Sequence, residues 1–194
     1  MLQLIRNDHK NLTVLIHLLQ DKLGRLRQDE PINYGLIRDV VAYMQEYADR
    51  YHHKFEDVIY DYYLKHKMGV ASDAINRLEQ EHQRIASDTA AFRELIEMIL
   101  LDSVVPRDTF VERLEAFINQ QLRHMEHEER EILPELEKTL TLADWQAIAA
   151  SLPGYDGDEP ATSTVHRMDP LFGDEVAHRY RDLALSLQRS IPQS

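Results

Sequence analysis

The chain has 194 residues, of which 43% are hydrophobic and 29% are charged, and its formal net charge is −12 at pH 7. This length suits one domain with a single apolar core, and the acidity repels a phosphate backbone, so we expect no nucleic-acid partner. The sequence contains no cysteine, which excludes disulfides, thiolate metal sites and a cysteine nucleophile and leaves nitrogen and oxygen atoms to bind any metal.

The sequence shows no sign of a membrane segment or of an export signal. It has no apolar run long enough to cross a membrane, and its first residues lack a basic leader followed by an apolar stretch. We therefore expect a cytoplasmic protein without a membrane partner. The 10 histidines stand out in the composition, and their positions guide the functional interpretation.

Two long helices are predicted in the first part of the chain. Residues 2–26 form the first, because leucine and isoleucine recur there at helical spacing. The second is predicted over residues 31–67, with Pro31 as its first residue and one continuous apolar stripe. A turn at residues 68–70 separates it from the next helix.

Two more helices complete a repeating pattern. The third begins at Ser72, whose hydroxyl can accept from the free amides of the first turn, and it extends to a connection at residues 102–107. Pro106 introduces the fourth, and Pro134 should kink that helix or end its regular part. Four long amphipathic helices joined by short loops predict an all-α fold, an up-down antiparallel four-helix bundle.

A further helical segment follows this bundle. Residues 1–140 make up the predicted bundle and residues 141–194 a C-terminal helical extension. The extension begins with a short helix around Trp145, continues through a loop at residues 153–172 and ends in an amphipathic helix. That last helix could pack on the bundle or on a second subunit, so a homodimer stays open.

Two of the predicted helices carry a histidine followed four residues later by a glutamate: His52 with Glu56, and His124 with Glu128. This spacing puts both side chains on one face of a helix, where each can reach a metal ion beside it. The two pairs are 72 residues apart, as expected for two similar helical hairpins. Facing each other, they would form the skeleton of a dinuclear site.

The other two helices each supply a histidine that follows an acidic residue. In an up-down bundle this repeat brings four histidines and two glutamates to one depth around the central axis. If both glutamates and a shared oxygen bridge two six-coordinate ions, about two positions stay open for a ligand. The predicted metal ligands are His9, His52, Glu56, His82, His124 and Glu128.

Other histidines leave alternatives open. His127 and Glu131 have the same spacing, but this pair would spoil the 72-residue correspondence. His53 and His127 are expected at the rim of the site, with donation to the ligands as the alternative. His17 is expected to be an ordinary interface residue, with a fifth imidazole ligand as the alternative. The tyrosines of the second helix are assigned no function.

These motifs resemble the hemerythrin-like, or HHE cation-binding, family over about residues 1–140. The resemblance implies a four-helix bundle around a non-haem di-iron centre, with two iron ions joined by an oxo or hydroxo bridge. It rests on the ordered set of ligands and on the segments Ile5–His9, His52–Asp57, Glu81–His82 and His124–Pro134.

The family includes oxygen carriers, oxygen or redox sensors, iron sensors and proteins that repair iron–sulfur clusters. Blood-type carriers use five histidines and an aspartate as the second carboxylate, whereas the motifs here match four histidines and two glutamates. The cluster-repair branch has a cysteine-containing N-terminal extension, which this sequence does not show. The resemblance therefore favours a di-iron protein that binds or reacts with oxygen, nitric oxide or peroxide in sensing or stress response.

Two alternatives stay open beside this hypothesis. One is an iron-dependent sensing module that acts on a protein partner. The other is a structural bundle that holds zinc or no metal and has no redox chemistry. No nucleophile motif is visible, and whether the chain catalyses a reaction stays open.

Overall fold

The computed structural model describes residues 1–67 and 69–152, so the predicted loop at residues 153–172 and the helix after it lie outside the described residues. The described part is helical and contains no strand. Its elements are α1 (Leu2–Arg27), α2 (Tyr34–Tyr47), the π-helix η1 (Ala48–His52), α3 (His53–His66), α4 (Ser72–Leu100), α5 (Arg107–His127), the π-helix η2 (Glu128–Ile132), α6 (Leu133–Thr139) and α7 (Leu142–Ser151).

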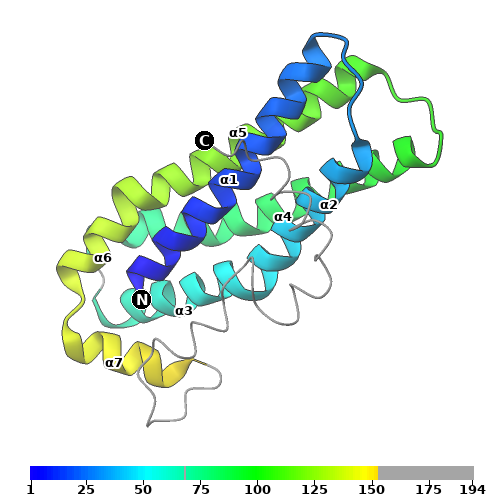
Figure 1. The fold of residues 1–194 in the computed structure, drawn as a ribbon. Coiled ribbons are helices and arrows are strands. Elements are labelled where there is room, and N and C mark those ends of the chain that lie inside the picture. Colours follow the sequence, from blue (N-terminus) through cyan, green and yellow to red (C-terminus); the bar gives the residue numbers. More distant parts are fainter. Residues whose placement is uncertain (68, 153–194) are drawn as a thin grey trace.

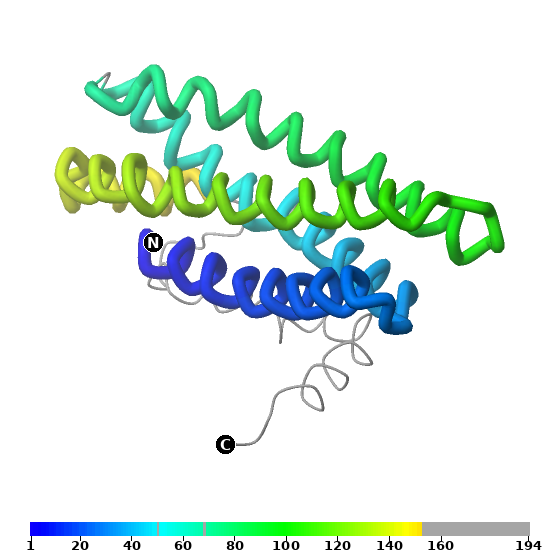
Figure 2. Tube along the Cα trace, turned by 90° about the horizontal axis from the view of Figure 1, so that it is seen from above, coloured from blue at the N-terminus to red at the C-terminus, as the bar shows by residue number. Residues whose placement is uncertain are grey.

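These elements form four antiparallel rods, as predicted. α1 is the first rod, α2 continues through η1 into α3 as the second, α4 is the third, and α5 continues through η2 into α6 as the fourth (Figures 1 and 2). The first rod packs on the fourth, and α4 packs on both the second and the fourth. The additional helix α7 crosses the end of the bundle and contacts α3.

Two apolar cores fill the bundle and are separated along its axis. One lies around Leu19, Tyr47, Phe92 and Phe110, between α1, α2, α4 and α5. The other lies around Ile59 and residues of α1, α3, α4, α6 and α7. Burial of apolar side chains stabilises each by roughly 25 cal/mol per Å² removed from water. The polar layer described below lies between them, so each rod passes from one core through this layer into the other.

The second rod differs from its prediction in where it starts and in its continuity. Its helix begins at Tyr34 because the side chain of Asn33 accepts a hydrogen bond from the Leu36 amide at 3.1 Å, so the prediction that Pro31 is the first residue was wrong. The π turn η1 then interrupts the α-helical pattern immediately before His53. Such wide turns are rare and are often found at functional sites.

The start of the third rod and the interruption of the fourth rod each depend on one residue singled out in the sequence, Ser72 and Pro134. The prediction that Ser72 caps α4 was wrong, because Ala71 occupies that position and the Ser72 hydroxyl is buried without a hydrogen-bond partner among the described residues. In the fourth rod the α-helical pattern ends at His127, and η2 leads into α6. Pro134 has no N–H to donate, which explains why the regular pattern is interrupted in the turn before it.

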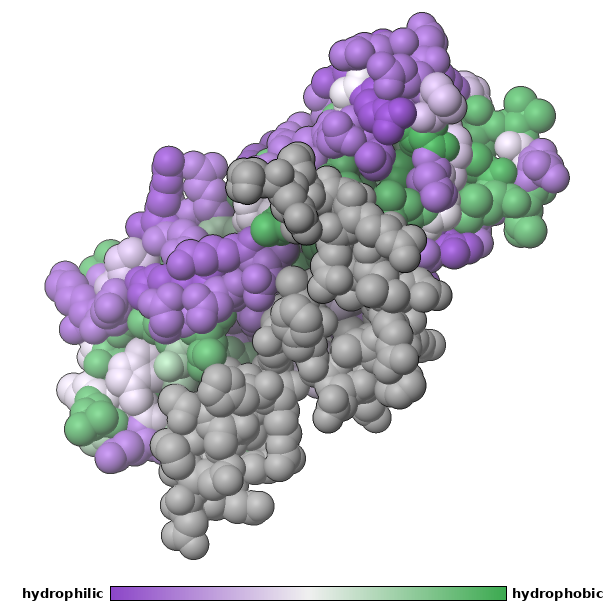
Figure 3. All heavy atoms as spheres, in the orientation of Figure 1, coloured by the Kyte–Doolittle hydropathy of each residue, from purple (hydrophilic) through white to green (hydrophobic). Residues whose placement is uncertain are grey.

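The outer surface of the bundle is largely charged and polar. Apolar surface gathers at the end where α4 connects to α5, and the exposed side chains there include Leu101 and Val104 (Figure 3). None of the described helices is long and apolar enough to span a membrane.

Candidate metal centre

All six predicted ligand residues meet in the polar layer between the two cores. Each rod contributes: α1 carries His9, the second rod His52 and Glu56, α4 His82, and the fourth rod His124 and Glu128. All six side chains are buried, and both glutamates have an exposed fraction of 0%. Burying two carboxylates is costly unless cations or hydrogen-bond donors compensate for the lost hydration.

The ring Nε2 atoms of the histidines point toward the glutamate oxygens. On one side, Nε2 of His9 lies 3.3 Å from Oε2 of Glu128, and Nε2 of His52 lies 3.3 Å from Oε1 of Glu56. On the other side, Nε2 of His82 lies 3.7 Å from Oε2 of Glu56. The two oxygen atoms of Glu56 therefore face histidines on opposite sides of the layer.

His53 also belongs to this cluster, so the prediction that it lies at the rim was wrong. It is buried, and its ring stacks on that of His82 with 4.0 Å between ring centroids. The prediction assumed the regular α-helical rotation between His52 and His53. The π turn η1 ends at His52, and its smaller rotation per residue lets both histidines face the bundle interior.

Two groups of side chains could each hold a metal ion. Within each group, one ligand atom from every residue lies within 4.8 Å of the others. Glu56 belongs to both groups, so the two positions are adjacent and share a carboxylate. The first group is His53, Glu56, His82 and His124, and the second is His9, His52, Glu56 and Glu128.

The polar atoms that face the centre fit bound cations. Among the described residues, the inward Nε2 atoms of the four predicted histidines, both oxygens of Glu56 and Oε2 of Glu128 are buried without a hydrogen-bond partner. Buried polar atoms nearly always have a hydrogen-bond partner in folded proteins. A cluster of this many unpaired polar atoms at one place therefore needs an explanation. Imidazole nitrogens and carboxylate oxygens are suitable ligands for divalent transition metals, which would satisfy all of these atoms at once.

A comparison with protein families agrees with this geometry. The family model described as "Hemerythrin HHE cation binding domain" matches residues 1–136 of the chain. The chain belongs to this family. No curated protein and no solved structure matches it. The hemerythrin-like domain is thus a cation-binding bundle, and the family match ends within α6, before α7 begins.

Carboxylates contact the outer nitrogen atoms of three of the predicted ligand histidines in the hemerythrin-like domain. Nδ1 of His9 lies 2.9 Å from Glu129, and Nδ1 of His52 lies 3.3 Å from Asp8. Nδ1 of His82 lies 3.3 Å from Asp57. Such contacts fix the orientation and tautomer of a metal-binding imidazole and raise its basicity.

These carboxylates form a ring around the bundle. Each acidic residue is adjacent in sequence to one ligand but contacts a histidine on the next rod. Asp8 on the first rod contacts His52 on the second, and Asp57 on the second rod contacts His82 on the third. Glu129 on the fourth rod contacts His9 on the first. Glu81 on the third rod faces His124 on the fourth, but the distance of 3.9 Å between Glu81 Oε2 and His124 Nδ1 is too long for a hydrogen bond.

Tyr60 adds a hydrogen bond that sequence reasoning missed. Its hydroxyl donates to Oε1 of Glu128 at 2.8 Å, and both residues are buried. Burial and the nearby charge of Glu128 raise the pKa of Tyr60 well above its ordinary value, so the phenol stays a donor. The position of Tyr60 four residues after Glu56 was the available signal, since that spacing puts both on one face of α3.

The two glutamates attract protons to the surrounding histidines when no cation is present. Burial lowers the pKa of His9, but contacts with Glu128 and Glu56 outweigh it and raise that pKa to about 11. Burial also lowers the pKa of His82, but contacts with Asp57 and Glu128 outweigh this effect and raise that pKa to about 10. His53 differs, because burial and the neighbouring His82 and His52 hold its pKa well below the ordinary value.

The remaining histidines with open alternatives lie outside the two groups. His17 is on the exposed face of α1 and belongs to neither group, so the structure does not support the alternative of a fifth imidazole ligand at this position. His127 lies at the rim, where its ring contacts Glu81 and Glu131 rather than the glutamates of the centre. The shifted pair of His127 and Glu131 is therefore not part of the buried layer.

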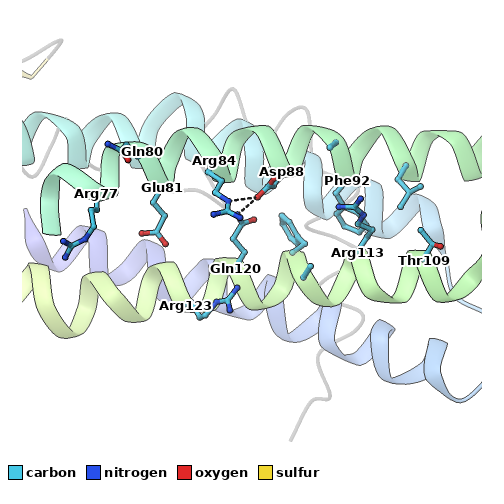
Figure 4. Close-up of a pocket in the computed structure, with 14 residues that line it drawn as sticks. Arg77, Gln80, Glu81, Arg84, Asp88, Phe92, Thr109, Arg113, Gln120 and Arg123 are labelled. Atoms are coloured by element: carbon cyan, nitrogen blue, oxygen red, sulfur yellow. Dashed lines mark hydrogen bonds and ion pairs between the residues drawn. The ribbon is translucent and has the colours of Figure 1, made fainter. Parts of the chain in front are cut away.

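A surface groove of about 980 Å³ runs between α4 and α5 and reaches the edge of the centre (Figure 4). Glu81 lies near one end of it, with its carboxylate turned toward α5. Arg77, Arg84, Arg113 and Arg123 also line this groove. Glu81 therefore lies between this groove and the outer side of the His124 ring.

Proposed function

We propose that this hemerythrin-like domain holds two iron ions and that the pair binds or reacts with a small oxidant such as oxygen, nitric oxide or peroxide. The observation that carries the proposal is the position of Glu56. Its Oε1 atom lies 3.3 Å from His52 and its Oε2 atom 3.7 Å from His82. A buried carboxylate whose two oxygens face different histidines is suited to bridge two cations.

The two ions would differ in their ligands. One group contains three imidazoles, from His53, His82 and His124, and the other contains two. With both glutamates and one shared oxygen bridging, the first ion would be six-coordinate and the second would keep one open position. The sequence had predicted about two open positions, and the fifth imidazole from His53 accounts for the difference.

Iron held by these neutral imidazoles and carboxylates would supply reversible change between the ferrous and ferric states. The protein restricts what reaches it, because the ligand side chains are buried and an apolar core covers each side of the layer. A centre this enclosed favours a diatomic molecule or peroxide over a larger substrate. We place the domain in sensing or stress response, since both carboxylates are glutamates, unlike in the blood-type carriers.

Metal analysis of freshly purified full-length protein tests this proposal, combined with absorption spectra before and after anaerobic reduction and after return to air. We expect about two irons per chain and a near-ultraviolet band that disappears on reduction and returns with air. Zinc in place of iron, or protein without metal and without spectral change, would contradict the proposal and favour a structural bundle.

A pair of variants connects that signal to the bridging carboxylate. Glu56→Gln removes the shared anionic ligand, so we expect the band to be lost and the iron content to fall. Glu126→Gln removes the same charge from an exposed position on α5, where Glu126 pairs with Arg130, and should leave both unchanged. Equal behaviour of the two variants would count against a bridging role for Glu56.

A further inference from the structure

The groove between α4 and α5 contains arginines that have no ion-pair partner in the described part of the chain. Arg77, Arg113 and Arg123 line it from exposed positions, and none of the three pairs with a carboxylate of another described residue. Most other arginines of the described part do have such a partner, as Arg25 and Arg130 show. Acidic residues outnumber lysine and arginine by 34 to 22, so a shortage of carboxylates does not explain these unpaired arginines.

The two acidic side chains of the groove already have partners within the chain. Asp88 lies 3.6 Å from Arg84 and accepts a hydrogen bond from Gln120 at 2.8 Å. The Glu81 carboxylate is turned toward His124, 3.9 Å from its Nδ1 atom. The unpaired arginines therefore give this groove a local positive charge on a chain whose formal net charge is −12.

Apolar side chains form the floor between these charges. The rings of Phe92 and Phe117 lie there with 5.5 Å between their centroids, and both are buried. Ala91 and Ala116 line the same groove from exposed positions, where their small side chains allow another chain to approach closely. An occupant of the groove thus meets apolar surface in the middle and guanidinium groups around it.

The arginines are too widely spaced for one small anion. Figure 4 shows Arg123 on the side of Glu81, and Arg113 farther along the groove beside Phe92. The two arginines are 10 residues apart on α5, which corresponds to about 15 Å along the helix axis. A phosphate or a small dicarboxylate cannot reach both, whereas a peptide segment with several carboxylates can.

We propose that this groove is a docking surface for an acidic segment of a partner protein. Carboxylates of that segment would pair with Arg77, Arg113 and Arg123, and its apolar side chains would cover the floor at Phe92 and Phe117. A long polyanion such as a nucleic acid would meet the repulsion of the whole acidic chain, whereas a short segment meets the local charge of the groove. The inference does not depend on which metal the centre holds, and it goes beyond the proposed function by giving the domain a protein partner.

Fluorescence anisotropy with the full-length protein and a labelled synthetic peptide tests this surface. The peptide has about 15 residues and combines glutamate with leucine at helical spacing, and a matched peptide carries glutamine in place of each glutamate. The test variant is the double substitution Arg113→Gln with Arg123→Gln. The control is Arg25→Gln with Arg130→Gln, which changes the net charge equally at exposed positions outside the groove. Urea unfolding checks that each variant folds.

We expect the parent to bind the glutamate peptide more tightly than the glutamine peptide and the test variant to bind it about tenfold more weakly than the parent. The control variant should keep the parental affinity. Equal binding of the two peptides by the parent would overturn the proposal, as would an equal loss in both variants, which would indicate only a general effect of charge. Tighter binding of a labelled oligothymidylate than of the glutamate peptide, lost in the test variant, would also overturn it and identify a nucleic-acid surface instead.

Discussion

Replacing Tyr60 by phenylalanine removes one hydroxyl and leaves Oε1 of Glu128 without its phenol donor. The ring itself can stay in place, because phenylalanine has the same shape apart from the missing oxygen. Both residues are buried, so water cannot easily take over the hydrogen bond of 2.8 Å. The substitution therefore isolates one contact of the charged layer.

A hydrogen bond to a charged group contributes about 1.5–3 kcal/mol to stability, so the metal-free Tyr60→Phe variant should lose about that much free energy of unfolding. The loss should be smaller in the metal-loaded protein, about 0.5–1.5 kcal/mol, because bound cations also stabilise the Glu128 carboxylate. Urea unfolding measures both, with the midpoint shifting at an unchanged slope.

Tyr63 on the same helix supplies the matched control. Its side chain is also buried, but its hydroxyl has no hydrogen-bond partner among the described residues. Tyr63→Phe removes the same atom without breaking a hydrogen bond to any described residue, so the free energy of unfolding of this variant should stay within about 0.5 kcal/mol of the parent or rise. Equal destabilisation by the two substitutions, or none by Tyr60→Phe, would refute the argument that this phenol supports Glu128.

Three further predictions concern the ligands, the protons and the bundle end. His53→Ala should weaken the binding of one metal ion by about 10- to 100-fold or more, whereas His17→Ala at the surface should not, as equilibrium metal titration would measure. Because the pKa values of His9 and His82 are about 11 and 10, metal loading near neutral pH should release about two protons per chain. Calorimetry in buffers of different ionisation enthalpy measures this number, and a value near zero would contradict the prediction. Both pKa values lie above the ordinary 6.5, so their contribution to the stability of the metal-free protein is complete below that pH and disappears as the pH rises through 10 to 11. Thr141→Ala removes the side chain that caps α7 and should cost about 0.5–2 kcal/mol in urea unfolding, while an unchanged midpoint would mean that α7 does not depend on this cap.

The bundle and the clustering of the six predicted ligands followed from spacing alone. A four-residue spacing on a helix puts His52 and Glu56 on one face, and the 72-residue repeat places His124 and Glu128 opposite them. Helical periodicity is a strong signal over long segments, because every turn of each rod repeats it. The metal-binding roles of these residues stay a prediction until metal is measured.

The position of His53 could not be predicted because it depends on a local change of helix geometry. The sequence from residue 31 to residue 67 looks like one uninterrupted amphipathic helix, and nothing in it marks the π turn at Ala48–His52. An error of a fraction of a turn is enough to move a side chain from the rim to the interior. The outer carboxylates did carry a signal, since each is adjacent in sequence to a ligand, but their partners lie on neighbouring rods and depend on the packing.

The ring of outer carboxylates makes the four rods depend on one another. Asp8 on the first rod orients His52 on the second, and Asp57 on the second orients His82 on the third. A shift of the first, second or fourth rod therefore moves that rod's own predicted ligand and also removes the carboxylate that orients a histidine on the neighbouring rod. Mutations that loosen one helix should consequently lower metal affinity at both positions together. The centre should therefore form in a single cooperative step together with the packing of the four rods.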